Sequence, residues 1–152
     1  MHNQESKEKL LISACLFGEN VRYDGKNNLV EDLERLKEKY ELIPFCPEVS
    51  SGMTIPRAAN EIQSFNPLVV KNEFGINTTD YFIDGAMQTA HSCKHNNIKI
   101  ALLKSKSPSC GINEVYDGTF SKTLIKGQGL TANILMQQNI KLYDENQIGE
   151  LI

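Results

Sequence analysis

Short hydrophobic runs alternate with longer amphipathic stretches along this chain. Runs rich in β-branched residues predict strands at residues 10–14, 41–45, 67–70, 98–103 and 140–143. Apolar residues at helical spacing predict helices at residues 29–40, 78–96, 131–138 and 145–152. Because strands and helices alternate, we expect the α/β class: a single domain with a mainly parallel sheet and helices on both faces.

The pattern also makes local predictions. Asn28 is placed to cap the first helix. In the second helix we expect the inward residues to be Tyr81, Phe82, Ala86, Ala90 and Cys93. Residues 49–67 have no regular period, so we interpret them as a functional loop or a short helix. Residues 111–129 are polar and rich in turn signals.

The length and charge of the chain limit the number of domains and the kinds of partner that we expect. The chain of 152 residues is long enough for one domain, and we expect a disordered tail at residues 1–9 and a folded domain at residues 10–152. A formal net charge of −3 argues against a nucleic-acid polymer as the partner. The tail is a poor signal peptide, and no apolar run is long enough to cross a bilayer. We therefore expect a cytoplasmic protein without a membrane partner; the oligomeric state is not predicted.

Three cysteines share one placement relative to the expected strands. Cys15 and Cys46 follow the first two strands directly, and Cys110 follows the strand at residues 98–103 across a short loop. If the strands are parallel, all three thiols lie at the same edge of the sheet, where open α/β sheets bind ligands. In a cytosolic protein, four cysteines are better explained as thiols or metal ligands than as a disulfide framework.

Such convergence suits a metal ion or a cluster held by three thiolates, with one coordination position left open. The alternative is that these cysteines are small buried hydrophobes that happen to end strands. Cys93 lies on the inward face of a helix, and we interpret it as a core residue. His91 and His95 are four residues apart near a helix end, where complementing the helix dipole explains them better than metal binding.

The motifs of the chain resemble the thiouracil desulfurase-like family. In order, they are Ser13-Ala14-Cys15-Leu16-Phe17-Gly18, Arg22-Tyr23-Asp24-Gly25, Cys46-Pro47-Glu48, Pro56-Arg57, Ser107-Pro108-Ser109-Cys110-Gly111 and Tyr116-Asp117-Gly118-Thr119-Phe120. The resemblance covers nearly the whole chain. It implies a Rossmann-like domain that holds a 4Fe-4S cluster on Cys15, Cys46 and Cys110, with one open iron. It also implies that Glu48 and Ser107 are the catalytic pair beside the cluster.

This resemblance suggests a non-redox desulfuration. A soft open iron would bind the sulfur of a small thiolated molecule, and water would add to the thiocarbonyl carbon. We expect Glu48 to act in general acid–base catalysis and Ser107 to donate a hydrogen bond to the substrate. A surface carboxylate and a loop-stabilising hydroxyl are the alternatives for these two residues. Loop-ordering or turn-forming roles are expected for Arg22, Asp24, Arg57 and Asp117.

Three other functions remain open at this stage. The same cysteines could serve a non-catalytic iron–sulfur sensor or scaffold, or a metal-free thiol enzyme with Cys110 as its nucleophile. Zinc on three thiolates is a further alternative. The sequence does not identify the natural substrate or the sulfide acceptor.

Overall fold

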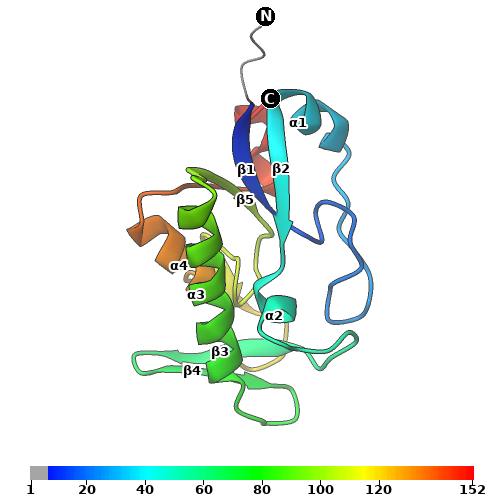
Figure 1. The fold of residues 1–152 in the computed structure, drawn as a ribbon. Coiled ribbons are helices and arrows are strands. Elements are labelled where there is room, and N and C mark those ends of the chain that lie inside the picture. Colours follow the sequence, from blue (N-terminus) through cyan, green and yellow to red (C-terminus); the bar gives the residue numbers. More distant parts are fainter. Residues whose placement is uncertain (1–6) are drawn as a thin grey trace, which may run out of the picture.

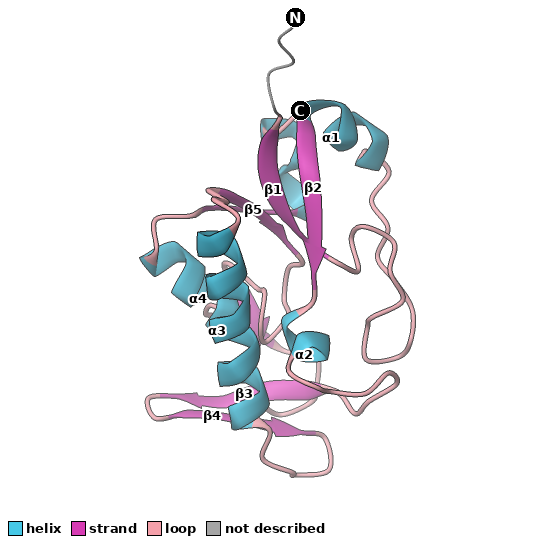
Figure 2. Cartoon of the chain, in the orientation of Figure 1, coloured by secondary structure: helices cyan, strands magenta, loops and turns pink. Residues whose placement is uncertain are grey.

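A parallel four-stranded sheet forms the centre of the computed structural model, which describes residues 7–152 (Figures 1 and 2). The sheet has the order β2-β1-β5-β8, and all neighbouring strands are parallel. Its strands are β1 (Glu8–Ser13), β2 (Tyr40–Phe45), β5 (Ile100–Leu103) and β8 (Lys141–Asp144). The predicted α/β class is therefore confirmed, and all four strands end at the same edge.

Helices cover both faces of this sheet. Consecutive strand residues point to opposite faces, so Leu10 and Ile12 enter one hydrophobic core while Leu11 enters the other. The core around Leu11 includes buried residues of α3 (Thr79–His95) and α4 (Leu130–Gln137). The core on the opposite face includes buried residues of α1 (Leu33–Lys39) and of the 3₁₀ helix η1 (Glu145–Glu150).

Two small antiparallel hairpins complete the fold. They consist of β3 (Asn60–Phe65) with β4 (Leu68–Asn72), and β6 (Glu114–Tyr116) with β7 (Leu124–Lys126). The β3–β4 hairpin lies across the molecule below the ends of β1 and β2 (Figure 1). A third hydrophobic cluster, formed by Ile62, Val70, Phe82 and Val115, holds the hairpins against α3.

Several local predictions were wrong. Helix α1 begins at Leu33 rather than after Asn28, because Asn28 accepts a hydrogen bond from the Arg22 side chain and stays in the preceding loop. Tyr81 is 45% exposed rather than buried, whereas the other four expected inward residues of α3 are buried. The strand predicted at residues 67–70 is present as β4, but it pairs with β3 in the hairpin and not with the main sheet.

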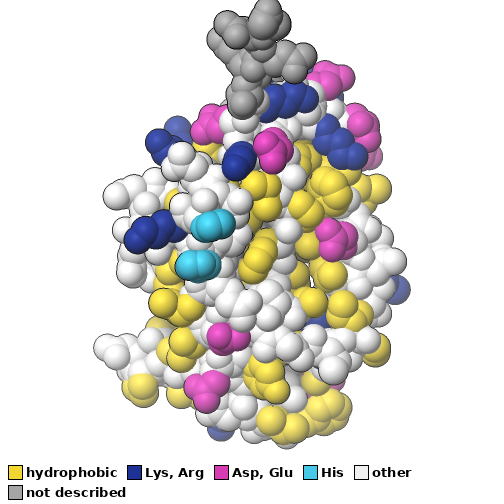
Figure 3. Space-filling view, in the orientation of Figure 1, with side chains coloured by type: hydrophobic (Ala, Val, Ile, Leu, Met, Phe, Trp, Pro, Cys, Tyr) yellow, Lys and Arg dark blue, Asp and Glu magenta, His cyan; other side chains and the backbone are white. Residues whose placement is uncertain are grey.

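Three further features concern the start of the folded part, the length of the helices and the molecular surface. Strand β1 begins at Glu8, so the folded part starts before the expected boundary at residue 10. Lys7 donates a hydrogen bond to the carbonyl of Lys37 at 2.7 Å, and residues 1–6 of the expected tail lie outside the described residues. No helix among residues 7–152 is long and apolar enough to cross a membrane. Charged side chains gather near the start of β1 and around α1, and hydrophobic ones are more frequent lower on the same face (Figure 3).

Candidate functional site

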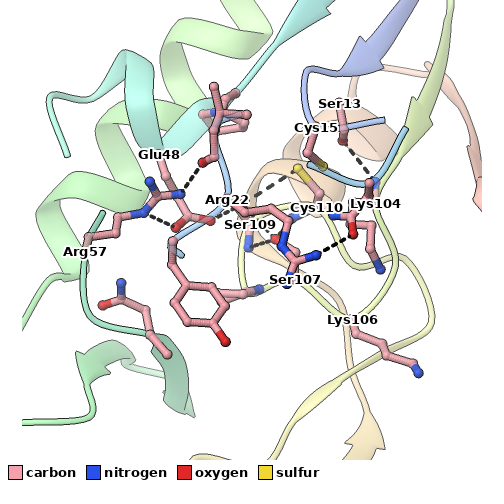
Figure 4. Close-up of a pocket in the computed structure, with 18 of the residues that line it drawn as sticks. Ser13, Cys15, Arg22, Glu48, Arg57, Lys104, Lys106, Ser107, Ser109 and Cys110 are labelled. Atoms are coloured by element: carbon pink, nitrogen blue, oxygen red, sulfur yellow. Dashed lines mark hydrogen bonds and ion pairs between the residues drawn. The ribbon is translucent and has the colours of Figure 1, made fainter. Parts of the chain in front are cut away.

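The three cysteines predicted from strand position line one cavity. This cavity has a volume of about 540 Å³ and lies at the edge where β1, β2 and β5 end. Cys15 follows β1 after Ala14, Cys46 directly follows β2, and Cys110 lies in the loop after β5. All three thiols are free. In Figure 4, Cys15 and Cys110 lie on one side of the cavity, and Glu48 and Arg57 lie on the other.

Backbone hydrogen bonds fix the loop that carries Cys110. The N–H of Gly111 donates to the carbonyl of Ser107 at 2.9 Å. At the start of α4, the N–H of Leu130 donates to Pro108 at 3.1 Å, and the N–H of Ala132 donates to Ser109 at 3.1 Å. The loop therefore contacts the first turn of α4 directly.

The segment that carries Cys46 is fixed in a different way. The short helix α2 (Pro47–Ser50) begins immediately after Cys46 and packs against α3. Gly85 of α3 makes this contact possible, because a Cβ atom at that position would overlap the carbonyl oxygen of Pro47. The glycine is needed here for space.

The protonation of the three thiols depends mainly on burial. The pKa of Cys110 is raised to about 12, mainly by burial and also by the nearby Cys46 and Cys15, although hydrogen bonds from Ser13 and Ser109 lower it. Burial also raises the pKa of Cys15 and the pKa of Cys46. These thiols are therefore protonated at neutral pH in the protein alone, and a metal group that binds them as thiolates must displace their protons.

Glu48 and Arg57 form a buried ion pair beside these thiols. Arg57 Nε lies 3.2 Å from Glu48 Oε1, and the two side chains are only 9% and 14% exposed. Arg57 also donates to the carbonyl oxygens of Val21 and Thr54, so its position is fixed by three segments of the chain. The carboxylate of Glu48 thus has a defined orientation towards the cavity.

Ser107 is the second predicted catalytic residue that the structure brings to this site. Its Oγ accepts hydrogen bonds from the N–H groups of Ser109 at 3.1 Å and Cys110 at 3.0 Å. It also lies 2.9 Å from Ser109 Oγ, which in turn lies 3.0 Å from Glu48 Oε2. Glu48 and Ser107 are therefore linked through one hydroxyl group.

The residues predicted to order the surrounding loops form ion pairs or a turn. Arg22 and Asp24 form an ion pair at 2.8 Å, whereas Arg57 pairs with Glu48 and not with an aspartate. Asp117 is exposed and accepts hydrogen bonds from the N–H and hydroxyl of Thr119, which lower its pKa. Asp117 therefore forms a turn.

The sequence pattern does not indicate Glu61, a buried carboxylate on the cavity wall. It is 8% exposed, and its Oε1 accepts hydrogen bonds from the N–H groups of Gly118 at 2.9 Å and Phe120 at 3.1 Å. Glu61 thereby ties β3 to the loop between β6 and β7, and Tyr116 at the end of β6 and Phe120 in this loop also line the cavity. The only sequence signal was a glutamate in a stretch without periodicity, which does not distinguish it from a surface residue.

The remaining candidates lie away from the cavity lining. Cys93 is buried in the core between the sheet and α3, and burial raises its pKa to about 11. His91 and His95 stack on each other on α3 with ring centroids 6.1 Å apart. Neither group contributes to the cavity lining.

Comparison with known proteins gives a consistent result over the whole domain. A model of the 2-thiouracil desulfurase family matches residues 10–147. The chain is 32% identical to the uncharacterized protein YbbK of Bacillus subtilis (strain 168), covering 94% of this chain and 99% of YbbK. Among solved structures, it is similar to the 4Fe-4S-dependent thiouracil desulfidase TudS, with a TM-score of 0.88, 37% identity and 95% of each chain covered. The motifs, the fold and these matches agree, and the chain belongs to the 2-thiouracil desulfurase family.

Proposed function

We propose that this protein is a 4Fe-4S-dependent desulfurase of thiocarbonyl compounds, such as a thiouracil-like nucleobase or a thioamide. The reaction exchanges sulfur for the oxygen of water, giving a carbonyl product and hydrogen sulfide, so it needs neither an oxidant nor a reductant. The observation that carries this proposal is the meeting of three thiols with Glu48 and Ser107 around one cavity. Membership of the family and similarity to TudS support the same conclusion.

The donor set fits an iron–sulfur cluster better than a single metal ion. Within residues 7–152, no group of three or more His, Cys, Asp or Glu side chains is placed to hold one metal ion. In a cubane cluster each thiolate binds a different iron, so the ligands stand farther apart than around one ion. We therefore assign Cys15, Cys46 and Cys110 as ligands of the cluster, which leaves one iron without a protein ligand.

When bound, the cluster supplies a soft Lewis acid for the substrate sulfur. Glu48 supplies the protein's acid–base function: its carboxylate takes a proton from the attacking water and returns one to the departing sulfur or to a ring nitrogen. The buried ion pair with Arg57 keeps this carboxylate in one orientation during both transfers. Ser107 is connected to Glu48 through Ser109 Oγ, which is 2.9 Å from Ser107 Oγ and 3.0 Å from Glu48 Oε2.

The test is anaerobic cluster reconstitution followed by a sulfide assay with 2-thiouracil. We expect the wild-type protein to bind iron and sulfide and to release sulfide and uracil in equal amounts. Cluster-loaded protein that releases no sulfide from 2-thiouracil or from simple thioamides would contradict the proposal and favour an iron–sulfur sensor. Turnover by iron-free protein would instead indicate a thiol enzyme that uses Cys110.

A further inference from the structure

The hydroxyl group of Ser109 occupies the centre of the site. Its Oγ is 2.9 Å from Ser107 Oγ, 3.0 Å from Glu48 Oε2 and 3.6 Å from Cys110 Sγ. Ser109 is only 2% exposed. Water therefore competes little for these hydrogen bonds.

The hydrogen bonds around Ser107 Oγ and Ser109 Oγ determine which group donates each proton. A hydroxyl oxygen has two lone pairs and one proton. Both lone pairs of Ser107 Oγ are used, because it accepts from the N–H groups of Ser109 and Cys110. Ser107 must therefore donate its proton, and Ser109 Oγ is 2.9 Å away to accept it. Ser109 then donates its own proton to Glu48 Oε2, because a carboxylate in an ion pair with Arg57 is an acceptor.

We propose that Ser109 is the positioning residue that holds the carboxylate of Glu48 and the hydroxyl of Ser107 in one hydrogen-bonded chain. This inference rests on the proposed function. Through this chain Ser109 donates to Glu48 Oε2 while Arg57 Nε contacts Glu48 Oε1, so each carboxylate oxygen has one fixed partner. The two N–H groups that point at Ser107 Oγ hold the far end of the chain in place.

The Ser109 hydroxyl is not needed to hold the Cys110 loop in place. The Cys110 loop is already held by backbone bonds from Gly111, Leu130 and Ala132, none of which uses the Ser109 side chain. Removing the hydroxyl should therefore leave the loop and the thiols in place. What it removes is the common partner of Ser107 and Glu48.

The first arm of the test is Ser109→Ala in anaerobically reconstituted protein with 2-thiouracil. We expect kcat to fall about 100-fold while KM stays within about twofold, because Glu48 loses the hydrogen bond that orients it for proton transfer and substrate binding is not affected. Iron and sulfide contents should equal those of the wild type. Ser105→Ala is the matched control, since it removes a hydroxyl of the same loop that binds Glu145 instead of Glu48.

The second arm does not depend on turnover. Crystal structures of the cluster-free wild type and Ser109→Ala should differ in the positions of the Glu48 carboxylate oxygens, with the backbone of the loop unchanged. Ser109→Thr, which keeps a hydroxyl at this position, should restore both the positions and most of kcat.

The outcomes separate this inference from the proposed function. Wild-type kcat in Ser109→Ala would overturn the inference, as would a loss of activity matched by an equal loss of iron, because the hydroxyl would then act through Cys110. If the wild type released no sulfide, the proposed function would fail. The structures would then still decide the inference, because unchanged positions of the Glu48 carboxylate oxygens would overturn it.

Discussion

The two sides of the cavity are built in different ways. On the sheet side, adjacent parallel strands deliver the three cysteines, and their positions follow from topology. On the opposite side, Arg57 and Glu61 hold segments that are distant in sequence through individual hydrogen bonds to Val21 and Gly118. The comparison teaches that cofactor binding and turnover should be separable. Substitutions on the sheet side should remove the cluster, and substitutions on the opposite side should leave it bound.

The largest effect is expected for Cys110→Ala on the sheet side. We expect the variant to lose the cluster and all desulfuration, because Cys110 is the most buried of the three thiols and water has little access to replace it. The measurement is iron and sulfide content per chain after anaerobic reconstitution, with sulfide release from 2-thiouracil. Cys93→Ala is the matched control, since it removes a buried thiol outside the cavity. A full cluster in Cys110→Ala would refute the ligand assignment.

Glu48→Gln tests the opposite side directly. We expect a full cluster but a decrease in kcat of about 10²- to 10⁴-fold, which is the usual contribution of a general acid–base group. The melting temperature should also fall, because Arg57 keeps its charge in a buried position without a carboxylate partner. Iron content, kcat and thermal melting are measured on the same preparation. A variant that keeps wild-type kcat would exclude Glu48 from the chemistry.

Glu61→Ala should have a smaller effect. Two backbone N–H groups lose their acceptor, so we expect about 2 kcal/mol less unfolding free energy. The loop between β6 and β7, which contains Phe120, should become less ordered, which should raise KM more than it lowers kcat. Chemical denaturation and steady-state kinetics measure the two effects, with the exposed Glu73→Ala as a control on the same wall. An unchanged free energy of unfolding would show that the two hydrogen bonds contribute nothing.

The smallest effect concerns Glu145, which binds the loop after β5 on the sheet side. Burial alone would raise the pKa of Glu145, but hydrogen bonds from Lys104 and Ser105 lower it below the ordinary value of 4.5. A carboxyl whose pKa is lowered by folding stabilises the protein fully above its unfolded pKa, and this contribution is lost as the pH falls through the folded value. We expect Glu145→Gln to cost about 1 kcal/mol at neutral pH and less below pH 4.5. Melting temperatures of both proteins across this range measure it, and a difference that does not shrink in acid would contradict the assignment.

Sequence patterns were informative where structure is local. The ends of β1, β2 and β5 follow from short apolar runs, and this alone predicted where the three thiols lie. Helix α3 was predicted almost to the residue because its buried face repeats over several turns. The exposed Tyr81 shows the limit of the pattern, since an aromatic residue at the edge of a helical face can point to solvent.

The two hairpins, and the side of the cavity opposite the cysteines, have no such local sequence pattern. Strands β6 and β7 are three residues long, which is too short for a reliable alternation, and Val115 is the one member that is buried. The Glu61 contacts join residues 57 and 59 positions apart, so no local pattern reports them. Similarly, the roles assigned to Glu48 and Ser107 came from resemblance to a family rather than from spacing.

The glycine at position 85 has a consequence for how this protein can be inactivated. An alanine there adds one methyl group on the side of α3 that faces Pro47. To make room, the short helix that starts after Cys46 would have to shift, taking a thiol and the adjacent carboxylate with it. In a genetic screen, such an allele would resemble the loss of one of the proposed cluster ligands, although Cys46 and Glu48 would still be encoded.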